Sequence, residues 1–592
     1  MSSKKLELTW YGKDKQFHIE PRILVENKDL SFKNEEMASL KNIGIFDNIL
    51  IHGDNLLALK SLEQEFTNKI SCIYIDPPYN TGNAFEHYDD NLEHSIWLSL
   101  MKERLIVLRK LLKEDGAIFI QIDDEECAYL KVLCDEVFGR NNYLNTIAVR
   151  MKNIAGASGG GEDRRLKKNV EFILVYTKDY TCYKWLRNAY SYTEIYELVN
   201  YYKKNDISWK YTSILYDKGS EEYLCSTVDG DGNEIKIFNR IGAKFLSVGQ
   251  VAKLENISEK EVYYKYMDSI YTTAMPQSSI RPRVMEKLKD IKHEDLISIK
   301  YVPKTGKNKG IEYEQFYKGE KFRLFTWLKD VIEFRDGKYL KKDLQGTYWD
   351  GFNLNNLTKE GKVEFPKGKK PEALLKRIIE MSTNEGDIVL DSFLGSGTTC
   401  AVAHKMKRKW VGIEMGSQAY THCKVRLDSI INGTDQSGVS EEVGWTAGGG
   451  YKFYELAPTL ILEDSFGQSV INGSYNPAML ALAIAKHEGY KYSPDEQCYW
   501  KQSKNDNNSY LYVTTQHINL QIIEAIKTDL KVDEFLLVVC KSFDADCNIG
   551  NKNIKIKKIP QSLLKNCEFG VENYNLNIIN PPSYEEEEED YE

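Results

Sequence analysis

Two stretches of the chain alternate short apolar strands with helices, and this alternation constrains the fold more than any other feature. In the helix predicted over about 92–112, apolar residues recur every three or four positions, as on a face that packs against a sheet. Such alternation predicts an α/β fold with a doubly wound, parallel sheet, whose ligands bind at the carboxyl ends of its strands. The first stretch is predicted to contain strands at 49–51, 70–75, 117–122 and 170–176 and helices at 56–65, 92–112 and 125–138; the second, strands at 388–390 and 411–413 and helices at 371–381, 398–405 and 418–431.

One of these strands ends in Ile-Tyr-Ile-Asp-Pro-Pro-Tyr-Asn, residues 73–80. Pro77 and Pro78 stop the strand, and their fixed φ holds the Asp76 carboxylate and the Tyr79 ring in nearly constant positions. The amine of adenine is a poor nucleophile because its lone pair is delocalised. Asp76 and the Pro77 carbonyl can each accept one amine hydrogen while Tyr79 stacks on a base flipped out of the duplex, so the turn predicts base methylation. A plain turn with a solvated Asp and a surface Tyr is the alternative.

A second strand, turn and helix at 387–399 predicts a site for the methyl donor. Gly395 and Gly397 allow positive φ and close backbone approach, and the helix from about Thr398 presents unpaired N–H groups to a carboxylate or phosphate. Glu414 ends the next strand, where an acid reaches a ribose hydroxyl pair in βαβ nucleotide sites. A tight βα turn, or a dinucleotide site whose third glycine is missing here, remains the alternative, as does a plain strand-end charge at Glu414.

The two motifs together resemble those of amino-methylating DNA methyltransferases that use S-adenosylmethionine. Asp76–Tyr79 matches the Asp-Pro-Pro-Tyr motif, Phe393–Gly397 matches the Phe-x-Gly-x-Gly motif, and Glu414 matches the strand-end acid. The catalytic motif precedes the cofactor motif, which is the permuted order of the group's β class. Asp in the first position favours adenine over cytosine, and Asn80–Gly82 with Phe85–Tyr88 continues as in the adenine-specific members.

The resemblance also implies roles for individual residues. His52–Asn55 resembles the cofactor-side segment that opens the catalytic half, and Phe365–Pro371 resembles the segment before the cofactor strand. Catalysis is expected from Asp76, Pro77, Pro78 and Tyr79. The residues expected at S-adenosylmethionine are Asp54, Asp76, Lys367, Asp391, Phe393, Gly395, Ser396, Gly397, Thr398 and Glu414, and no metal is expected.

Outside the motifs, Leu8–Lys13 and the runs Val443–Trp445 and Gly448–Glu455 resemble the modification subunit of type III restriction-modification systems. This resemblance implies a site-specific adenine methyltransferase that acts on double-stranded DNA as a homodimer beside a separate restriction subunit, a nuclease and translocase. Three alternatives stay open: a solitary DNA adenine methyltransferase without a nuclease partner, an RNA or protein-glutamine methyltransferase, and a catalytically dead DNA-recognition subunit.

A chain of 592 residues is too long for one hydrophobic core. The expected fold is a doubly wound, Rossmann-like methyltransferase sheet with an inserted target-recognition domain and a C-terminal α+β domain. The expected boundaries are an N-terminal arm at 1–30, a catalytic half at 31–180, the target-recognition domain at 181–350, a cofactor-binding half at 351–455 and a C-terminal domain with an acidic tail at 456–592.

The insert is rich in Tyr and Lys, so its aromatic and basic side chains are suited to a DNA strand. Pro276–Arg283 is its predicted contact loop, in which Arg281 and Arg283 reach guanine edges or phosphates. An unrelated globular insertion with a tyrosine-rich core is the alternative.

The net charge of −9 counts against nucleic-acid binding unless the charges are segregated. Basic clusters at 304–309, 341–342, 367–370 and 405–409 are read either as phosphate contacts or as solvated faces. No apolar run approaches the roughly 18 residues of a membrane span, and the first residues lack an apolar signal core. The 11 cysteines form no Cys-x-x-Cys pair, which indicates neither a disulfide framework nor structural zinc. A cytoplasmic protein is expected.

Overall fold

The computed structural model describes residues 7–14, 19–20, 22–34, 47–79, 94–152, 166, 168–184, 190–230, 232–276, 279–303, 309–335, 337–354, 357–365, 368–505, 507–548 and 552–559. These residues form two compact units, of which the first comprises Met1–Asn188 with Gly346–Glu592 and the second Ala189–Gln345. The other predicted boundaries stay predictions. The adenine-type loop Asn80–Tyr88, Lys367, most of the 304–309 cluster and the acidic tail lie outside the described residues.

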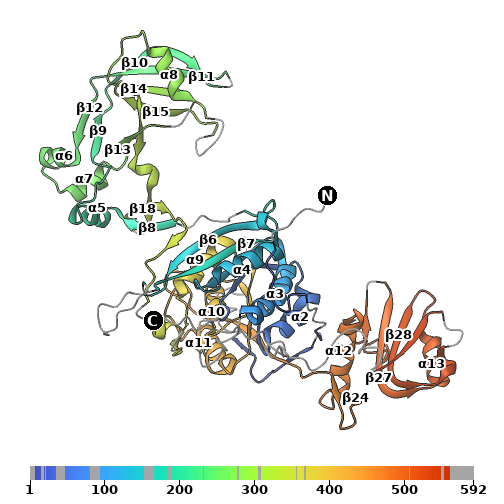
Figure 1. The fold of residues 1–592 in the computed structure, drawn as a ribbon. Helices are drawn as coiled ribbons and strands as arrows, with labels where there is room; N and C mark the ends of the chain where they lie inside the picture. The colour runs from blue at the N-terminus through green and yellow to red at the C-terminus, as the bar shows by residue number, and fades with distance from the viewer. Residues whose placement is uncertain are drawn as a thin grey trace, which may run out of the picture. The chain divides into compact units, whose positions relative to one another are not determined.

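The first unit is built on an 11-stranded sheet in the order β1-β22-β3-β21-β20-β4-β5-β7-β6-β19, with β2 paired to β22 (Figure 1). The run from β22 through β3, β21, β20 and β4 to β5 is parallel. The bounds are β1 Leu24–Glu26, β2 Phe32–Asn34, β3 Asn48–His52, β4 Ile70–Ile75, β5 Leu112–Ile122, β6 Tyr143–Arg150, β7 Val170–Thr177, β19 Tyr348–Trp349, β20 Ile388–Asp391, β21 Lys409–Glu414 and β22 Gly449–Leu456. Every residue of β4 is buried, as expected for a strand covered on both faces.

Helices cover both faces of this sheet, which confirms the predicted α/β fold and its doubly wound sheet. One face packs α2, α3 and α4 against Ile73, Ile118 and Leu390 of the sheet, and Figure 1 shows α9, α10 and α11 on the other side. The bounds are α2 Asn55–Phe66, α3 His94–Leu111, α4 Cys127–Cys134, α9 Glu372–Ser382, α10 Thr398–Lys405 and α11 Val425–Ile431. Short helical turns accompany them: the π-helical turns η1 Asp135–Gly139 and η5 Ala419–Lys424 and the 3₁₀ turns η2 Arg140–Asn142 and η4 Leu357–Lys362.

The prediction of a wholly parallel sheet is wrong at its two sides. β7 runs antiparallel to β5 and to the unpredicted strand β6, and β1 and β2 run antiparallel to β22. Alternation of strands and helices predicts crossover connections between parallel strands, and it carries no signal for strands that pair antiparallel, such as β6 and β7. The predicted helices at 125–138 and 418–431 each contain a π-helical turn.

Part of the basic cluster at 405–409 is neither a solvated face nor a phosphate contact. Lys405 is buried, and its Nζ lies 2.9 Å from Oε2 of Glu372 and 3.1 Å from Oδ2 of Asp435. Arg408 is also buried and donates to the backbone and hydroxyl of Thr383. Burial raises the pKa of Glu372, but Arg426 and Lys405 outweigh it and hold that pKa below its ordinary value. Lys405 and Arg426 thus compensate the buried charge of Glu372, and Arg408 contacts Thr383.

The second unit contains an eight-stranded antiparallel sheet in the order β10-β11-β14-β15-β16-β13-β9-β12 and a three-stranded sheet, β17-β18-β8. The strands are β8 Tyr190–Glu194, β9 Ser213–Asp217, β10 Ser220–Val228, β11 Glu234–Ile241, β12 Lys244–Ser247, β13 Ile270–Ala274, β14 Leu296–Tyr301, β15 Tyr313–Lys318, β16 Arg323–Trp327, β17 Ile332–Arg335 and β18 Lys338–Leu344. The helices are α5 Ile195–Lys204, α6 Val248–Glu255, α7 Glu259–Lys265, α8 Ile280–Leu288 and the 3₁₀ turn η3 Leu328–Val331. Some of its tyrosines form core, since Tyr271 stacks on Phe325 with ring centroids 3.8 Å apart, whereas others, such as Tyr201 and Tyr223, are exposed.

The predicted contact loop at 276–283 is a helix from Ile280 onward, α8. A proline is tolerated in the first turn of a helix, because the N–H groups there have no partner within the helix, and Pro282 occupies that turn. Arg281 donates from Nη2 to the Lys321 carbonyl at 2.6 Å, and Nη1 of Arg283 lies 3.4 Å from the Val228 carbonyl. Both guanidinium groups therefore contact backbone of their own unit, and their contact with DNA stays a prediction.

The C-terminal part of the first unit forms a five-stranded mixed sheet, β25-β26-β27-β28-β29, with the helices α12 and α13. Its bounds are β25 Lys491–Tyr492, β26 Ser503–Lys504, β27 Ser509–Ile518, β28 Phe535–Phe543, β29 Ile554–Lys558, α12 Pro477–Glu488 and α13 Leu520–Asp529, with the hairpin β23 Ile461–Glu463 and β24 Ser469–Ile471 before it and the 3₁₀ turn η6 Ala545–Asn548 near its end. Among the helices that the structure describes, none combines the length and the apolar character needed to cross a bilayer.

Candidate active site

The two motif turns lie side by side at the carboxyl edge of the large sheet. β4 pairs in parallel with β20, with Val389 opposite Cys72 and Leu390 opposite Ile73. Parallel neighbours end at the same edge, so Asp76, which follows β4, and Asp391, which ends β20, stand next to one another. The predicted meeting of two turns more than three hundred residues apart in sequence is therefore present within one unit.

The Asp76 turn is held by hydrogen bonds on both sides of its prolines. The Tyr79 hydroxyl lies 2.6 Å from Oδ1 of Asp76 and 2.9 Å from Oε2 of Glu171, and can donate to either. Nε1 of the fully buried Trp97 donates to the Pro78 carbonyl at 2.7 Å. The turn is thus fixed by packing as well as by the proline rings.

Lys370 and Glu171 belong to this site, although the sequence did not single them out. The Lys370 ammonium lies 3.1 Å from Oδ2 of Asp76, 3.0 Å from Oε2 of Glu171 and 2.8 Å from the Tyr79 hydroxyl. Gln121 donates to Glu171 at 2.6 Å and accepts from Tyr74 at 2.5 Å, which extends the network to side chains of β5 and β4. Lys370 lies in the Phe365–Pro371 segment, in which Lys367 is the residue that the sequence predicts at the cofactor. Glu171 is a single acid within strand β7, and no motif around it indicates a role.

Electrostatics divide the roles of these groups. Burial raises the pKa of Asp76 to about 6, Lys370 opposes that rise and Glu171 adds to it. Burial also raises the pKa of Glu171, but Lys370 and the Gln121 hydrogen bond outweigh it and keep that pKa below its ordinary value. The pKa of Lys370 is raised because its two acids outweigh its burial. Above pH 6 the cluster thus holds two carboxylates and one ammonium.

The turn after β20 needs both of its glycines. Gly395 and Gly397 have φ of +56° and +81°, in the left-handed region that favours glycine. A Cβ on Gly397 would lie 3.2 Å from the Cα of Cys423 in η5, so η5 closes on the turn. The Gly395 N–H donates to Oε2 of Glu414 at 2.7 Å and the Gly416 N–H donates to Oε1 at 2.9 Å. The strand-end acid therefore braces two backbone turns.

The other predicted cofactor residues mostly hold this turn together. Asp391 is 2% exposed and accepts from the Phe393 N–H at 2.9 Å and the Thr399 hydroxyl at 2.5 Å. Its burial raises the pKa of Asp391 to about 7, with a further contribution from the charges of Asp76 and Glu414. The Ser396 and Thr398 hydroxyls lie 3.1 Å apart, and both residues are buried.

Asp54 follows β3 and lies at the same carboxyl edge of the sheet as the two turns. Its Oδ1 caps helix α2 by accepting from the Leu57 N–H at 3.0 Å, and its Oδ2 lies 3.3 Å from Nη2 of the fully buried Arg104. Arg104 donates from Nε to Asn55 at 2.5 Å, and Asn55 donates to the Ser392 carbonyl at 2.8 Å. Asp54 is therefore linked to the turn after β20 through two side chains.

The residues around these acids fit a polar, nucleoside-like cofactor. Ser392 and Gln418 are each 1% exposed, and within the described residues the Ser392 hydroxyl and both polar atoms of the Gln418 amide have no hydrogen-bond partner. A buried polar group left unpaired costs about 1–3 kcal/mol. Ser392 follows Asp391, and the Gln418 amide packs against Gly416 beside Glu414. Hydroxyl and ring-nitrogen groups of a bound nucleoside would satisfy such atoms.

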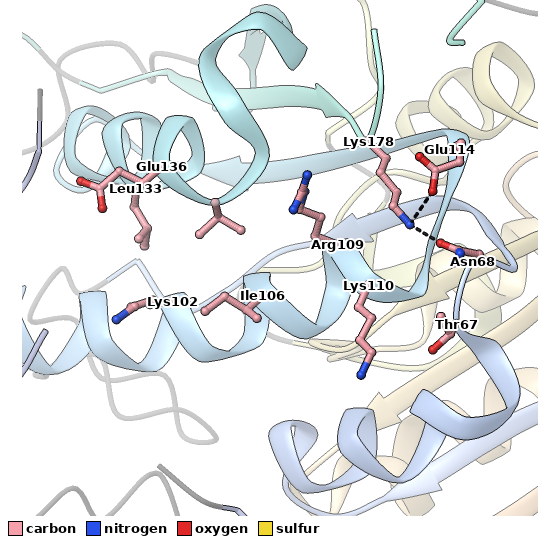
Figure 2. Close-up of a pocket in the computed structure, with 11 residues that line it drawn as sticks. Thr67, Asn68, Lys102, Ile106, Arg109, Lys110, Glu114, Leu133, Glu136 and Lys178 are labelled. Carbon is pink, nitrogen blue, oxygen red and sulfur yellow. Dashed lines mark hydrogen bonds and ion pairs between the residues drawn. The ribbon is translucent and has the colours of Figure 1, made fainter. Parts of the chain in front are cut away.

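A cavity of about 760 Å³ lies at the opposite edge of the sheet, where β4 and β5 begin. Figure 2 shows Lys102, Ile106 and Arg109 of α3 facing Leu133 and Glu136, with Lys178 bonded to Asn68 and Glu114. None of the predicted site residues lines this cavity. The candidate site is defined by convergent side chains instead.

The fold and the site define a class of Rossmann-like α/β enzymes. In this class, a turn suited to a nucleic-acid base (here Asp76–Tyr79) and a turn suited to a nucleoside cofactor (here around Gly395) follow adjacent strands. A family model described as DNA methylase matches residues 70–424, which include both turns. The chain belongs to this DNA methylase family.

Curated relatives carry more specific names. The chain is 44% identical over 413 residues, 70% of this chain and 54% of the relative, to the probable type III restriction-modification enzyme HindVI Mod subunit of Haemophilus influenzae. It is 26% identical over 490 residues, 72% of this chain and 65% of the relative, to the EcoP15I Mod subunit of Escherichia coli. This chain thus spans between about half and two thirds of the length of these relatives.

Solved structures give weak likenesses. The M1.HpyAVI–SAM complex is 15% identical with a TM-score of 0.28, over 64% of this chain and 99% of that chain. TTHA0409 of Thermus thermophilus, in its complex with S-adenosyl-L-methionine, is 14% identical with a TM-score of 0.29, over 69% of this chain and 100% of that chain. Scores this low carry no argument about the site, so the assignment rests on the family match.

Proposed function

We propose that this chain transfers a methyl group from S-adenosylmethionine to the N6 amine of adenine in double-stranded DNA, as the modification subunit of a type III restriction-modification system. The observation that carries the proposal is the position of the Asp76 and Gly395 turns at the ends of adjacent strands. The family match and the similarity to Mod subunits support it.

The cofactor side of the site is formed by the ends of β20 and β21. S-adenosylmethionine, when bound, supplies a methyl group on a positively charged sulfur. Glu414, Ser392 and Gln418 offer hydrogen-bond acceptors and donors to its nucleoside. Gly395 and Gly397 carry no side chain, so the cofactor can approach the backbone of this turn closely.

The substrate side is formed by the Asp76 turn. A target adenine flipped from the duplex presents its amine to the Asp76 carboxylate and the Pro77 carbonyl, while the Tyr79 ring stacks on the base. Accepting both amine hydrogens directs the nitrogen lone pair at the methyl carbon. Bound S-adenosylmethionine would supply the methyl group and keep the electron pair of the broken C–S bond. The Asp76 carboxylate would accept the proton that the methylated amine loses.

Sequencing that detects methylated bases tests the function. DNA from cells that express the chain is expected to contain N6-methyladenine at one defined sequence, absent from cells without it. N4-methylcytosine in its place would overturn the choice of adenine. Purified chain that labels RNA or protein from radioactive S-adenosylmethionine, but not DNA, would favour the corresponding alternative.

The partners and domain roles form part of the same proposal. The second unit, Ala189–Gln345, is proposed to recognise the target sequence, with Arg281 and Arg283 as contacts, and the chain is proposed to act as a homodimer in the cytoplasm. Co-purification of a nuclease and translocase subunit with the tagged chain is expected for a type III system. A dimer that purifies alone and methylates DNA would instead indicate a solitary methyltransferase.

Gln418→Leu separates cofactor binding from folding. Leucine has nearly the volume of glutamine but leaves no unpaired amide, so we expect the free protein to become about 1 kcal/mol more stable and the affinity for S-adenosylmethionine to fall about tenfold. Thermal unfolding and titration calorimetry measure the two effects. Gln516→Leu, at an exposed position, is the matched control and should change neither. Unchanged affinity in Gln418→Leu would remove Gln418 from the cofactor site.

A further inference from the structure

We propose that Lys370 and Glu171 are positioning residues of the active site: Lys370 keeps the Asp76 carboxylate ionised, Glu171 adds negative charge beside it, and both hold the Tyr79 hydroxyl so that its ring is ready to stack on the target base. The inference rests on the proposed function, because it assigns to these residues a part in the same methyl transfer. It concerns residues outside both sequence motifs.

The geometry around Lys370 is that of a three-way clamp. An ammonium group has three N–H donors, and three oxygens lie within reach of this one: those of Asp76 at 3.1 Å, Glu171 at 3.0 Å and Tyr79 at 2.8 Å. Three separate parts of the chain meet here, namely the turn after β4, strand β7 and the segment before α9. The Lys370 side chain is 8% exposed and that of Glu171 14%, so water competes little for these contacts.

The adjacent lysine shows what a purely structural buried lysine does at this position. Lys369 donates to the carbonyls of Glu360 and Val363, which fixes the loop before α9. The Lys370 ammonium instead contacts the Asp76 carboxylate and the Tyr79 hydroxyl, and its Nζ lies 5.0 Å from the centroid of the Tyr79 ring. Burying a cation beside two acids costs desolvation free energy, and well-packed apolar side chains of similar volume would often be as stable. Its presence between Asp76 and Tyr79 points to a role in the reaction.

The two residues act on Asp76 in opposite directions. The titratable groups around Asp76 are Lys370, Glu171, Tyr79, the buried Tyr74 and Asp391 on β20. Burial raises the pKa of Asp76 to about 6; within that balance Lys370 lowers it and Glu171 raises it. Asp76 must be ionised to accept an amine hydrogen. Transfer should therefore be lost as the pH falls through about 6, and removal of either neighbour should move this limit in a known direction.

Glu171 also sets the total charge next to the amine. With Asp76 and Glu171 ionised and Lys370 protonated, the cluster carries one net negative charge. The amine gains positive charge as the methyl group arrives, and a fixed anion in a water-poor site stabilises that change more than it stabilises the neutral base. Without Glu171 the remaining pair is neutral and this advantage is lost.

Rates of single-turnover methylation across pH test the proposal on the full chain, with S-adenosylmethionine and a DNA duplex that contains the sequence found by methylation sequencing. We expect Lys370→Met to slow transfer about a hundredfold at neutral pH and to move the acid limit upward. Glu171→Gln should slow transfer less and move the limit downward. Lys370→Arg should recover part of the rate.

Controls separate this inference from the function itself. Lys369→Met perturbs the same loop but removes no charge that contacts Asp76. The pH below which this variant loses transfer should therefore equal that of the unaltered chain. S-adenosylmethionine affinity should be unchanged in the Lys370 and Glu171 variants, which also reports that they are folded. If the unaltered chain transfers no methyl group to DNA, the proposed function fails. If it does, and Lys370→Met and Glu171→Gln leave the acid limit in place or move it in the same direction, the positioning role alone is wrong.

Discussion

Replacing Asp76 with alanine is expected to reduce methyl transfer to DNA at least about a thousandfold while S-adenosylmethionine still binds. The carboxylate is the acceptor for an amine hydrogen and the base for the departing proton, so the variant loses both contributions to the transition state. It also leaves Lys370 beside a single acid, Glu171, which further changes the charge at the amine. Single-turnover methylation and titration calorimetry measure the two quantities separately.

The matched control is Asp123→Ala. Asp123 follows β5, the strand next to β4, and burial raises its pKa to about 6 as well. Its carboxylate accepts from the Glu125 N–H at 3.0 Å and lies 3.9 Å from Nζ of Lys168, so its partners differ from those of Asp76. Transfer by this variant should stay within a fewfold of the unaltered chain. Transfer retained by Asp76→Ala would refute Asp76 as the essential acceptor.

The two motif turns could be predicted because their signals are local. A short run of apolar residues stopped by two prolines, or by glycines that open a helix, carries its own conformational preference in the sequence. Placing both turns at one sheet edge then follows from the parallel pairing of β4 and β20, because parallel neighbours end together. The sequence thus sufficed to predict the strands and turns that carry Asp76, Tyr79 and Glu414, whereas the roles of these residues stay predictions.

Lys370 and Lys405 could not be placed in the same way. Each stands in a basic run that is typical of a solvated surface, and burial of each depends on acids distant in the chain, such as Glu171 for Lys370 and Asp435 for Lys405. A charge is buried only where tertiary structure brings an opposite charge to it. The antiparallel side of the sheet escaped prediction for a related reason, since β7 pairs with β5, although α4 and β6 lie between these two strands in the chain.

Replacing Gly397 with valine is expected to weaken S-adenosylmethionine binding about a hundredfold or more. A β-branched residue avoids the φ of +81° found here, and its Cβ would lie 3.2 Å from the Cα of Cys423, a backbone atom that moves only if η5 moves. Because η5 also donates from Cys423 to the Gly395 carbonyl, the displaced segment would deform the turn that receives the cofactor. Titration calorimetry measures the affinity, and circular dichroism measures the stability.

Gly386→Val separates a damaged site from a strained backbone. Gly386 has a φ of +83°, nearly that of Gly397, but nothing lies within 4 Å of the Cβ that valine would add. Both variants should therefore lose a similar amount of stability from backbone strain, about 1–3 kcal/mol, whereas affinity should fall in Gly397→Val alone. Equal affinities in the two variants would show that the turn after β20 does not hold the cofactor. The adjacency of the two turns would then no longer support methyl transfer.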